Sequence, residues 1–106
     1  MATFIMLTRL SHDILKRPNS LLDLSQEVVK HIRQVCPEVE WKANYAVLGP
    51  VDYLDVFTAP DIDTAMKVAT IIRTFGHATT EIWAATEWEA FSAMTRNLPQ
   101  RAASAS

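Results

Sequence analysis

The chain has 106 residues, 49% of them apolar, and a formal net charge of −2. This length and composition predict one globular domain with a single core and argue against a disordered chain. The ten Lys and Arg residues are scattered, which argues against a nucleic-acid partner. No apolar run reaches the roughly 18 residues that a membrane-spanning helix needs, so no membrane partner is expected either.

The first predicted strand is Thr3–Leu10, which is rich in Phe, Ile, Leu and Thr. An irregular stretch containing Pro18 follows, and Ser20 then opens a predicted helix as part of a capping box. Pro37 ends this helix. Its apolar stripe recurs at steps of three and four: Leu21, Leu24, Val28, Ile32 and Val35.

The only cysteine, Cys36, lies at the end of this helix, so the chain cannot form an internal disulfide. This usage is typical of a protein of the reducing cytoplasm. Because no His and Asn partners accompany it, we expect a buried, inert thiol and not a nucleophile.

A hairpin and a second helix are expected next. Val39–Leu48 and Tyr53–Thr58 read as two strands joined by a turn at Gly49–Asp52, with Leu48 beside Tyr53. Asp61 is the expected N-cap of an amphipathic helix that Gly76 ends.

His77–Ala85 reads as the fourth strand, and Thr86–Glu89 as the capping box of a short third helix. The order strand, helix, strand, strand, helix, strand predicts a ferredoxin-like α+β sandwich with an extra C-terminal helix. Its antiparallel four-stranded sheet would have the order 4-1-3-2, with the first two helices on one face. We expect residues 1–98 to form this single domain and residues 99–106 to form a flexible tail.

The faces of the strands follow from their alternation. Leu54 and Val56 are the natural helix-facing pair of the third strand, and the small residues of the fourth strand would join them: Ala78, Thr80, Ile82 and Ala84. The helix-free face would then mix aromatic and polar side chains: Lys42, Asn44, Ala46, Tyr53, Asp55, Phe57, His77, Thr79, Glu81 and Trp83. Such a mixture is typical of a pocket or a partner surface.

Four residues of this face are the predicted ligand-binding or interface residues: Asn44, Tyr53, Phe57 and Trp83. The easiest partner is a second copy packed by two-fold symmetry, so we expect a homodimer or a higher homo-oligomer, with a small-molecule ligand as a further partner. Trp41 and Trp88 are expected in the core.

No catalytic residue is assigned from the sequence, but three candidates stand out. His77 could act as a general base with Asp55 or Glu81 across the strands; alternatively, it caps the preceding helix and makes an interface hydrogen bond. Asp55 is unusual in mid-strand and needs either a partner such as Lys42 or a place in a cavity. Asp52 has an ordinary role in the turn.

Metal and cofactor chemistry is not expected. The three histidines lack Cys or Glu neighbours at ligand spacing, and two glycines cannot make a phosphate-binding loop.

Two blocks carry a family resemblance. The turn Gly49–Asp52, a strand and then Ala59-Pro60-Asp61 form the first, and Arg73–Trp83 forms the second. Together they resemble the GYD-domain family over nearly the whole chain, Thr3 to about Leu98. Val51 stands where the family has its naming tyrosine.

The resemblance implies the dimeric α/β-barrel variant of the ferredoxin-like fold, and it implies no activity. Two hypotheses therefore stay open. One is a non-catalytic ligand-binding or assembly module that uses the helix-free sheet face. The alternative is a cofactor-independent, monooxygenase- or isomerase-like enzyme acting on a small aromatic or carbonyl compound, with His77, Asp55 or Glu81 transferring protons.

Overall fold

The computed structural model describes residues 1–12 and 18–99. Its elements in chain order are β1 (Ala2–Leu10), α2 (Pro18–Val35), β2 (Glu40–Ala46), β3 (Tyr53–Ala59), α3 (Ile62–Thr74), β4 (Ala78–Ala85) and α4 (Trp88–Arg96). The predicted tail lies, from residue 100 onward, outside the described residues. Within the described ranges, no helix combines the length and apolarity needed to cross a membrane.

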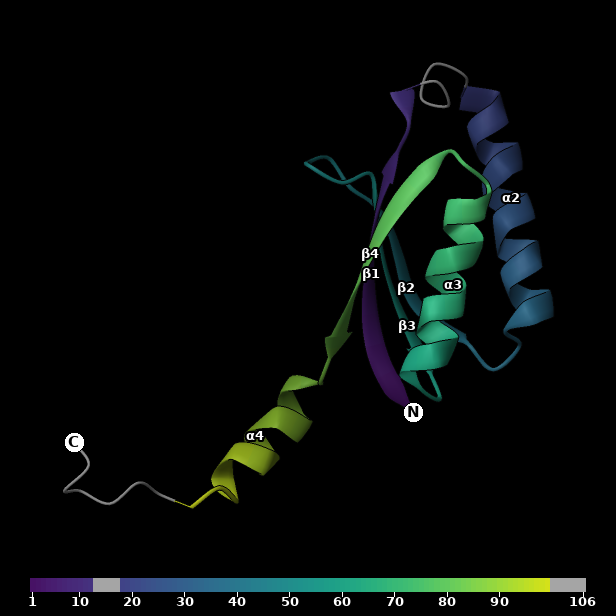
Figure 1. The fold of residues 1–106 in the computed structure, drawn as a ribbon. Coiled ribbons are helices and arrows are strands. Elements are labelled where there is room, and N and C mark those ends of the chain that lie inside the picture. The colour runs from purple at the N-terminus through teal and green to yellow at the C-terminus, as the bar shows by residue number, and fades with distance from the viewer. Residues whose placement is uncertain (13–17, 100–106) are drawn as a thin grey trace.

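The four strands form one antiparallel sheet in the order β2-β3-β1-β4. Both α2 and α3 lie on the same face of this sheet, and α4 points away from its far end (Figure 1). These observations confirm the predicted ferredoxin-like α+β architecture, its strand order and the additional C-terminal helix.

The ends of α3 form as the sequence predicts. The Oδ1 atom of Asp61 accepts hydrogen bonds from the backbone N–H of Thr64 at 2.8 Å and from the Thr64 hydroxyl at 2.7 Å. These bonds satisfy an orphan donor of the first turn and lower the pKa of Asp61. At the other end Gly76 adopts φ = 76°, a left-handed conformation that ends the helix at little steric cost.

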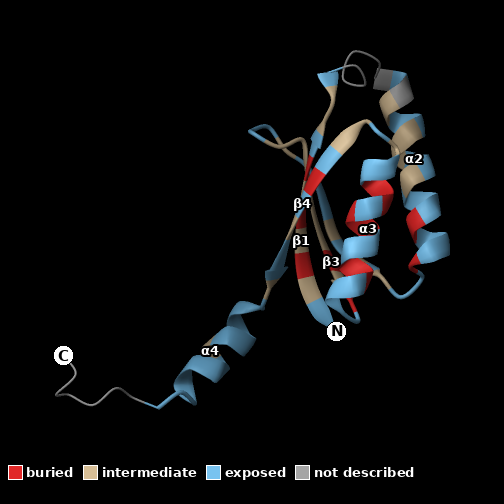
Figure 2. Ribbon diagram, viewed as in Figure 1, coloured by how far each residue is buried: buried red, intermediate tan, exposed pale blue. Residues whose placement is uncertain are grey.

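The core lies between the sheet and the two helices, where Figure 2 shows the buried residues of the strands and of α3 facing one another. Phe57 is 0% exposed at its centre. Its ring lies 5.5 Å from that of Phe4 in β1 and 5.2 Å from that of Trp41 in β2. A bulge at Lys42 makes the second contact possible, because it shifts Trp41 onto the same face as Phe57. The expectation that Trp41 belongs to the core is confirmed.

The predicted orientation of β3 is wrong. Tyr53, Asp55 and Phe57 face the helices, while Leu54 and Val56 occupy the helix-free face. Both faces of β3 carry apolar residues, so alternation alone does not choose between them. The larger aromatic ring of Phe57 fills the space beneath the helices. Because side chains alternate along a strand, Tyr53 and Asp55 then face the helices as well. In β4, by contrast, Thr80 is buried and pairs with the buried Thr8, as the predicted orientation of that strand requires.

The hairpin register also differs from the prediction. Tyr53 pairs with Ala46 and not with Leu48, so the connection is longer than a tight turn. Asp52 explains the difference, because its Oδ2 accepts from the N–H of Leu10 at 2.7 Å and its own N–H donates to the Thr8 carbonyl at 2.8 Å. These bonds hold the loop on β1. Asp52 is therefore structural, as expected: its side chain binds the neighbouring strand, and its carbonyl accepts from the N–H of Val47 at 2.8 Å across the hairpin.

Two helix starts differ from the sequence expectation. Helix α2 begins at Pro18, so Ser20 lies inside the helix and does not open it. The N-cap of α4 is Glu87, which makes no side-chain capping bond, so the predicted capping box does not form. Trp88 is 73% exposed, which corrects the prediction that it lies in the core. Among the described residues, no other helix or strand packs closely against α4 (Figure 2), and the Trp88 ring lies 5.5 Å from that of Phe91 in the same helix.

Cys36 is buried, as predicted, and burial raises the pKa of its thiol. A thiol that stays protonated in the core is a poor nucleophile. The sulfur therefore contributes to packing.

Truncation of the central ring should test the inverted face of β3. We expect Phe57→Ala to lower the free energy of unfolding by about 3–5 kcal/mol, the usual cost of removing a buried Phe. Met66→Ala, on the exposed side of α3, should change it by less than about 0.5 kcal/mol. Urea unfolding monitored by circular dichroism measures both, and equal effects would contradict the assigned core.

Candidate functional site

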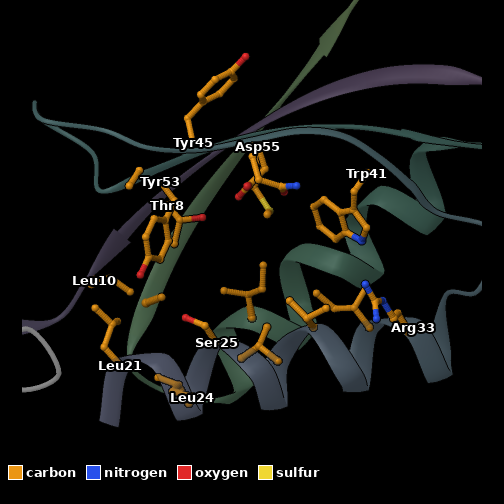
Figure 3. Close-up of a pocket in the computed structure, with 18 residues that line it drawn as sticks. Thr8, Leu10, Leu21, Leu24, Ser25, Arg33, Trp41, Tyr45, Tyr53 and Asp55 are labelled. Atoms are coloured by element: carbon orange, nitrogen blue, oxygen red, sulfur yellow. The ribbon is translucent and has the colours of Figure 1, made fainter. Parts of the chain in front are cut away.

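A cavity of about 500 Å³ lies between α2 and the sheet. It forms because α3 packs closely on β4 and β3, whereas α2 packs against α3 and stands further from the strands. Aliphatic side chains of α2 make one wall, among them Leu21, Leu24, Val28 and Ile32. The opposite wall comes from β1, β2 and β3 (Figure 3).

The sheet wall carries the polar groups. Figure 3 shows Thr8, Tyr53 and Asp55 pointing from the strands toward α2, with Trp41 beside them. The register explains this grouping, because Asp55 pairs with Met6 on one side and with Asn44 on the other. Polar atoms from three strands therefore meet in a mostly apolar space, which is the usual composition of a small-molecule site.

Asp55 is the most unusual of these residues. It is half-buried, and its carboxyl group takes part in no hydrogen bond or ion pair among the residues that the structure describes. Burial raises the pKa of Asp55 to about 6, because the charged form loses part of its hydration. Lys42, its expected partner, instead binds Glu40 at 2.9 Å. The sequence left two alternatives for Asp55, a partner such as Lys42 or a place in a cavity, and the structure shows the second.

Thr8 provides a second unsatisfied group. Its side chain is 4% exposed and lines the cavity, and its hydroxyl has no partner among the described residues. Thr80 beside it in β4 has the same deficit but does not line the cavity. A buried hydroxyl without a hydrogen bond is costly, and neighbouring atoms cover this oxygen, so Thr8 contributes the rest of its side chain to the cavity wall.

The predicted ligand residues are divided between three environments. Asn44 and Tyr53 line the cavity, while Phe57 lies in the closed core and cannot touch a ligand without unfolding. Trp83 is 54% exposed on the helix-free face, where it was expected. The four residues therefore do not form one site.

The three catalytic candidates are also separated. Glu81 pairs with Leu7 on the helix-free face, whereas Asp55 pairs with Met6 on the helix-covered face. His77 does not line the cavity, and its backbone carbonyl accepts from the N–H of Ser11 at 2.8 Å. The proposed partnership of His77 with Asp55 or Glu81 is therefore not assembled.

Cavity residues from β1 and α2 were not identified from the sequence, namely Thr8, Ser25 and Arg33. On their own elements they are ordinary polar residues of an amphipathic pattern. The polar Thr8 at an inward-facing position, in line with Phe4 and Met6, was the one usable signal.

The helix-free face is mainly aliphatic at its centre. Ile5 lies between Val56 and Trp83, and Leu7 lies between Leu54 and Glu81. Arg9 and Glu81 carry the charges closest to this centre on β1 and β4. Neither α2 nor α3 nor α4, the helices of the described ranges, covers this face (Figure 1).

Metal binding finds no support in the described ranges, where no three His, Cys, Asp or Glu side chains gather closely enough to hold an ion. The titratable and charged groups that line the cavity are Asp55, Arg33, Tyr45 and Tyr53. Tyr45 points to the other side of the sheet (Figure 3).

Fold and cavity together define a small ferredoxin-like α+β domain with a pocket between its sheet and its first long helix. The chain belongs to the GYD domain family, whose model matches residues 4–95. No curated protein and no solved structure matches the chain.

The raised pKa of Asp55 predicts a specific pH dependence of stability. The folded chain holds this proton up to about pH 6, whereas an unfolded Asp releases it near about pH 3.9. The Asp55 contribution to the free energy of unfolding should therefore fall as pH rises from about 4 to about 6, and then level off. We expect a loss of about 1–2 kcal/mol, because water at the cavity mouth screens part of the effect.

Urea unfolding of the wild type and of Asp55→Asn over this pH range measures the effect as the difference between the two proteins. The exposed Asp63→Asn variant is the matched control and should follow the wild type. Parallel curves for the wild type and Asp55→Asn would contradict the assigned environment.

Proposed function

We propose that this chain is a non-catalytic, self-associating module that binds a small molecule in the cavity beneath α2. One observation carries the proposal: the Asp55 carboxyl group, which has no hydrogen-bond or ion-pair partner among the described residues, lines an apolar cavity of about 500 Å³. This volume lies within the usual range of ligand pockets, about 300–1,000 Å³.

The walls of the cavity indicate how binding would work. Leu24, Val28 and Ile32 offer apolar area, which favours a ligand with a hydrophobic body. Asp55 and Asn44 offer hydrogen-bonding atoms on the opposite wall, which would orient that body. The proposal thus moves the ligand from the helix-free face, where the sequence suggested it, to the helix-covered face.

The enzyme alternative has less support. It needs a proton-transfer pair, and His77 and Glu81 do not line the cavity that holds Asp55. A half-buried carboxyl can accept a proton, and Tyr53 is the other titratable group of the sheet wall that points toward α2 (Figure 3). The histidine and the second carboxyl that the enzyme alternative assigned to proton transfer do not stand beside them. Binding without turnover therefore accounts for the geometry with fewer assumptions.

Self-association would use the helix-free face. Its centre of Ile5, Leu7, Leu54 and Val56 is apolar, and its margin is polar, which is the usual composition of a protein interface. Arg9 and Glu81 carry opposite charges on the same face. Two-fold pairing of identical faces can therefore bring unlike charges together, which favours a second copy as the partner.

Helix α4 supports the same partner. It has nine residues and no buried side chain, and an isolated helix of this length is marginal in water. Its exposed large apolar side chains are Trp88, Phe91 and Met94, and the exposed Leu98 follows just after its end. Because α4 follows the edge strand β4 directly, pairing of the sheets would bring it close to the second copy, where this stripe would be covered.

Ligand binding can be tested by NMR. Small apolar fragments should shift the backbone amide signals of Asp55, Thr8 and the cavity side of α2. Val28→Phe should abolish these shifts, because the larger ring occupies the cavity; Val35→Phe, on the exposed end of α2, should leave them. Shifts confined to the helix-free face, or unchanged in Val28→Phe, would contradict the proposal.

Self-association can be tested by light scattering after size-exclusion chromatography. We expect the wild type at twice the 11.9 kDa chain mass or more, and Leu54→Glu at the chain mass, because it buries a charge at the interface centre. Met66→Glu on the exposed side of α3 is the control and should keep the wild-type mass. The double variant Trp88→Ser/Phe91→Ser should associate more weakly, so it should dissociate at a higher protein concentration than the wild type does. A wild type that is monomeric at high concentration would refute this part.

A further inference from the structure

We infer that the ligand of this cavity is a small organic cation, with an apolar body against α2 and a protonated amine beside Asp55. The inference deepens the proposed function and rests on it, since it requires that the cavity binds a small molecule. It adds the chemical class of the ligand and the residue that selects it.

The first argument concerns hydrogen-bond polarity. The group at the centre of the sheet wall, the Asp55 carboxylate, only accepts hydrogen bonds when it is ionised. Asn44, on the neighbouring strand β2 and paired with Asp55, carries an amide oxygen that can accept as well. An ammonium group has three donors and no acceptor, so it complements these acceptor oxygens.

The second argument concerns charge. The lining residues carry two formal charges, on Asp55 and on Arg33. Arg33 is exposed on α2 and makes no ion pair with Asp55. A half-buried carboxylate without a cation is destabilised, and a bound ammonium would supply the missing charge. A bound anion would instead meet the Asp55 charge in the less hydrated part of the cavity.

The third argument concerns the aromatic neighbours. Tyr53 lies two residues before Asp55 on the same strand, and Trp41 lies on the adjacent strand; both rings face the cavity (Figure 3). Faces of Tyr and Trp rings attract organic cations, by about 0.5–2 kcal/mol depending on exposure. A carboxylate between two such rings is a suitable setting for an amine with an apolar body.

The test compares three molecules that share an indole body and differ in the end group: tryptamine, tryptophol and indole-3-acetate. Titration calorimetry of the full chain at about pH 7.5 should give tryptamine an affinity about tenfold higher than that of tryptophol, because a charged hydrogen bond is stronger than a neutral one. Indole-3-acetate should bind most weakly.

Asp55→Asn keeps the shape of the side chain and removes its charge. In this variant tryptamine and tryptophol should bind within about twofold of each other, while tryptophol keeps its wild-type affinity. Asp63→Asn, which removes the same charge from the exposed first turn of α3, should retain the tenfold preference.

The pH dependence of the wild type gives a readout that needs no variant. Asp55 has a pKa of about 6, and an alkylammonium stays charged to about pH 9 or beyond. The other titratable and charged groups that line the cavity are Arg33 on α2, Tyr45 on β2 and Tyr53 on β3. Tryptamine should therefore bind about tenfold more weakly at about pH 5, while tryptophol changes little.

The outcomes separate the two proposals. If tryptophol binds in the cavity and tryptamine binds no more tightly, the cation inference is overturned and the binding function stands. If none of the three binds and no other apolar fragment shifts the cavity signals, the proposed function fails as well. A tenfold preference that persists in Asp55→Asn would overturn the role of Asp55.

Discussion

The structure depends on the inward position of Phe57. Its ring fills the core between Phe4 and Trp41. Because side chains alternate along a strand, Asp55 and Tyr53 must then face the same side. The carboxyl group beneath α2 is thus a consequence of core packing. If β3 were turned so that Asp55 lay on the helix-free face, Phe57 would lie there too, and the core would lose its central ring.

Three aspartates within one short segment show how environment assigns roles. Asp52 accepts a hydrogen bond from β1 and holds the loop before β3. Asp61 accepts hydrogen bonds from Thr64 and begins α3, and its pKa falls. Asp55, between them, has no such donor in the described chain and its pKa rises. The two structural carboxylates fix both ends of β3, and the third is the one on which the proposed ligand site depends.

The two faces of the sheet have become separate surfaces. On the covered face, α3 packs closely because small residues such as Ala65 and Ala69 let it approach the strands. Helix α2 lies across the cavity from short side chains of β2, among them Asn44 and Ala46, which leave the space unfilled. On the other face, Leu7, Leu54 and Val56 have no helix above them. A ligand and a second copy would therefore bind on opposite sides of one layer and would not compete.

Local sequence determined most of the architecture. Asp61, Gly76 and the apolar periodicity of α2 and α3 act over one or two turns, so the elements, their order and the sandwich could be predicted. Asp55 and Tyr53 could be selected as unusual residues, because their chemistry is visible in the sequence. Only the tertiary structure decided which way they face, since β3 is apolar on both sides and the bulge at Lys42 and the bonds of Asp52 to β1 are long-range effects. Thr8 and Arg33 could not be identified from the sequence for the same reason, because they become part of the site only when distant segments pack around one cavity.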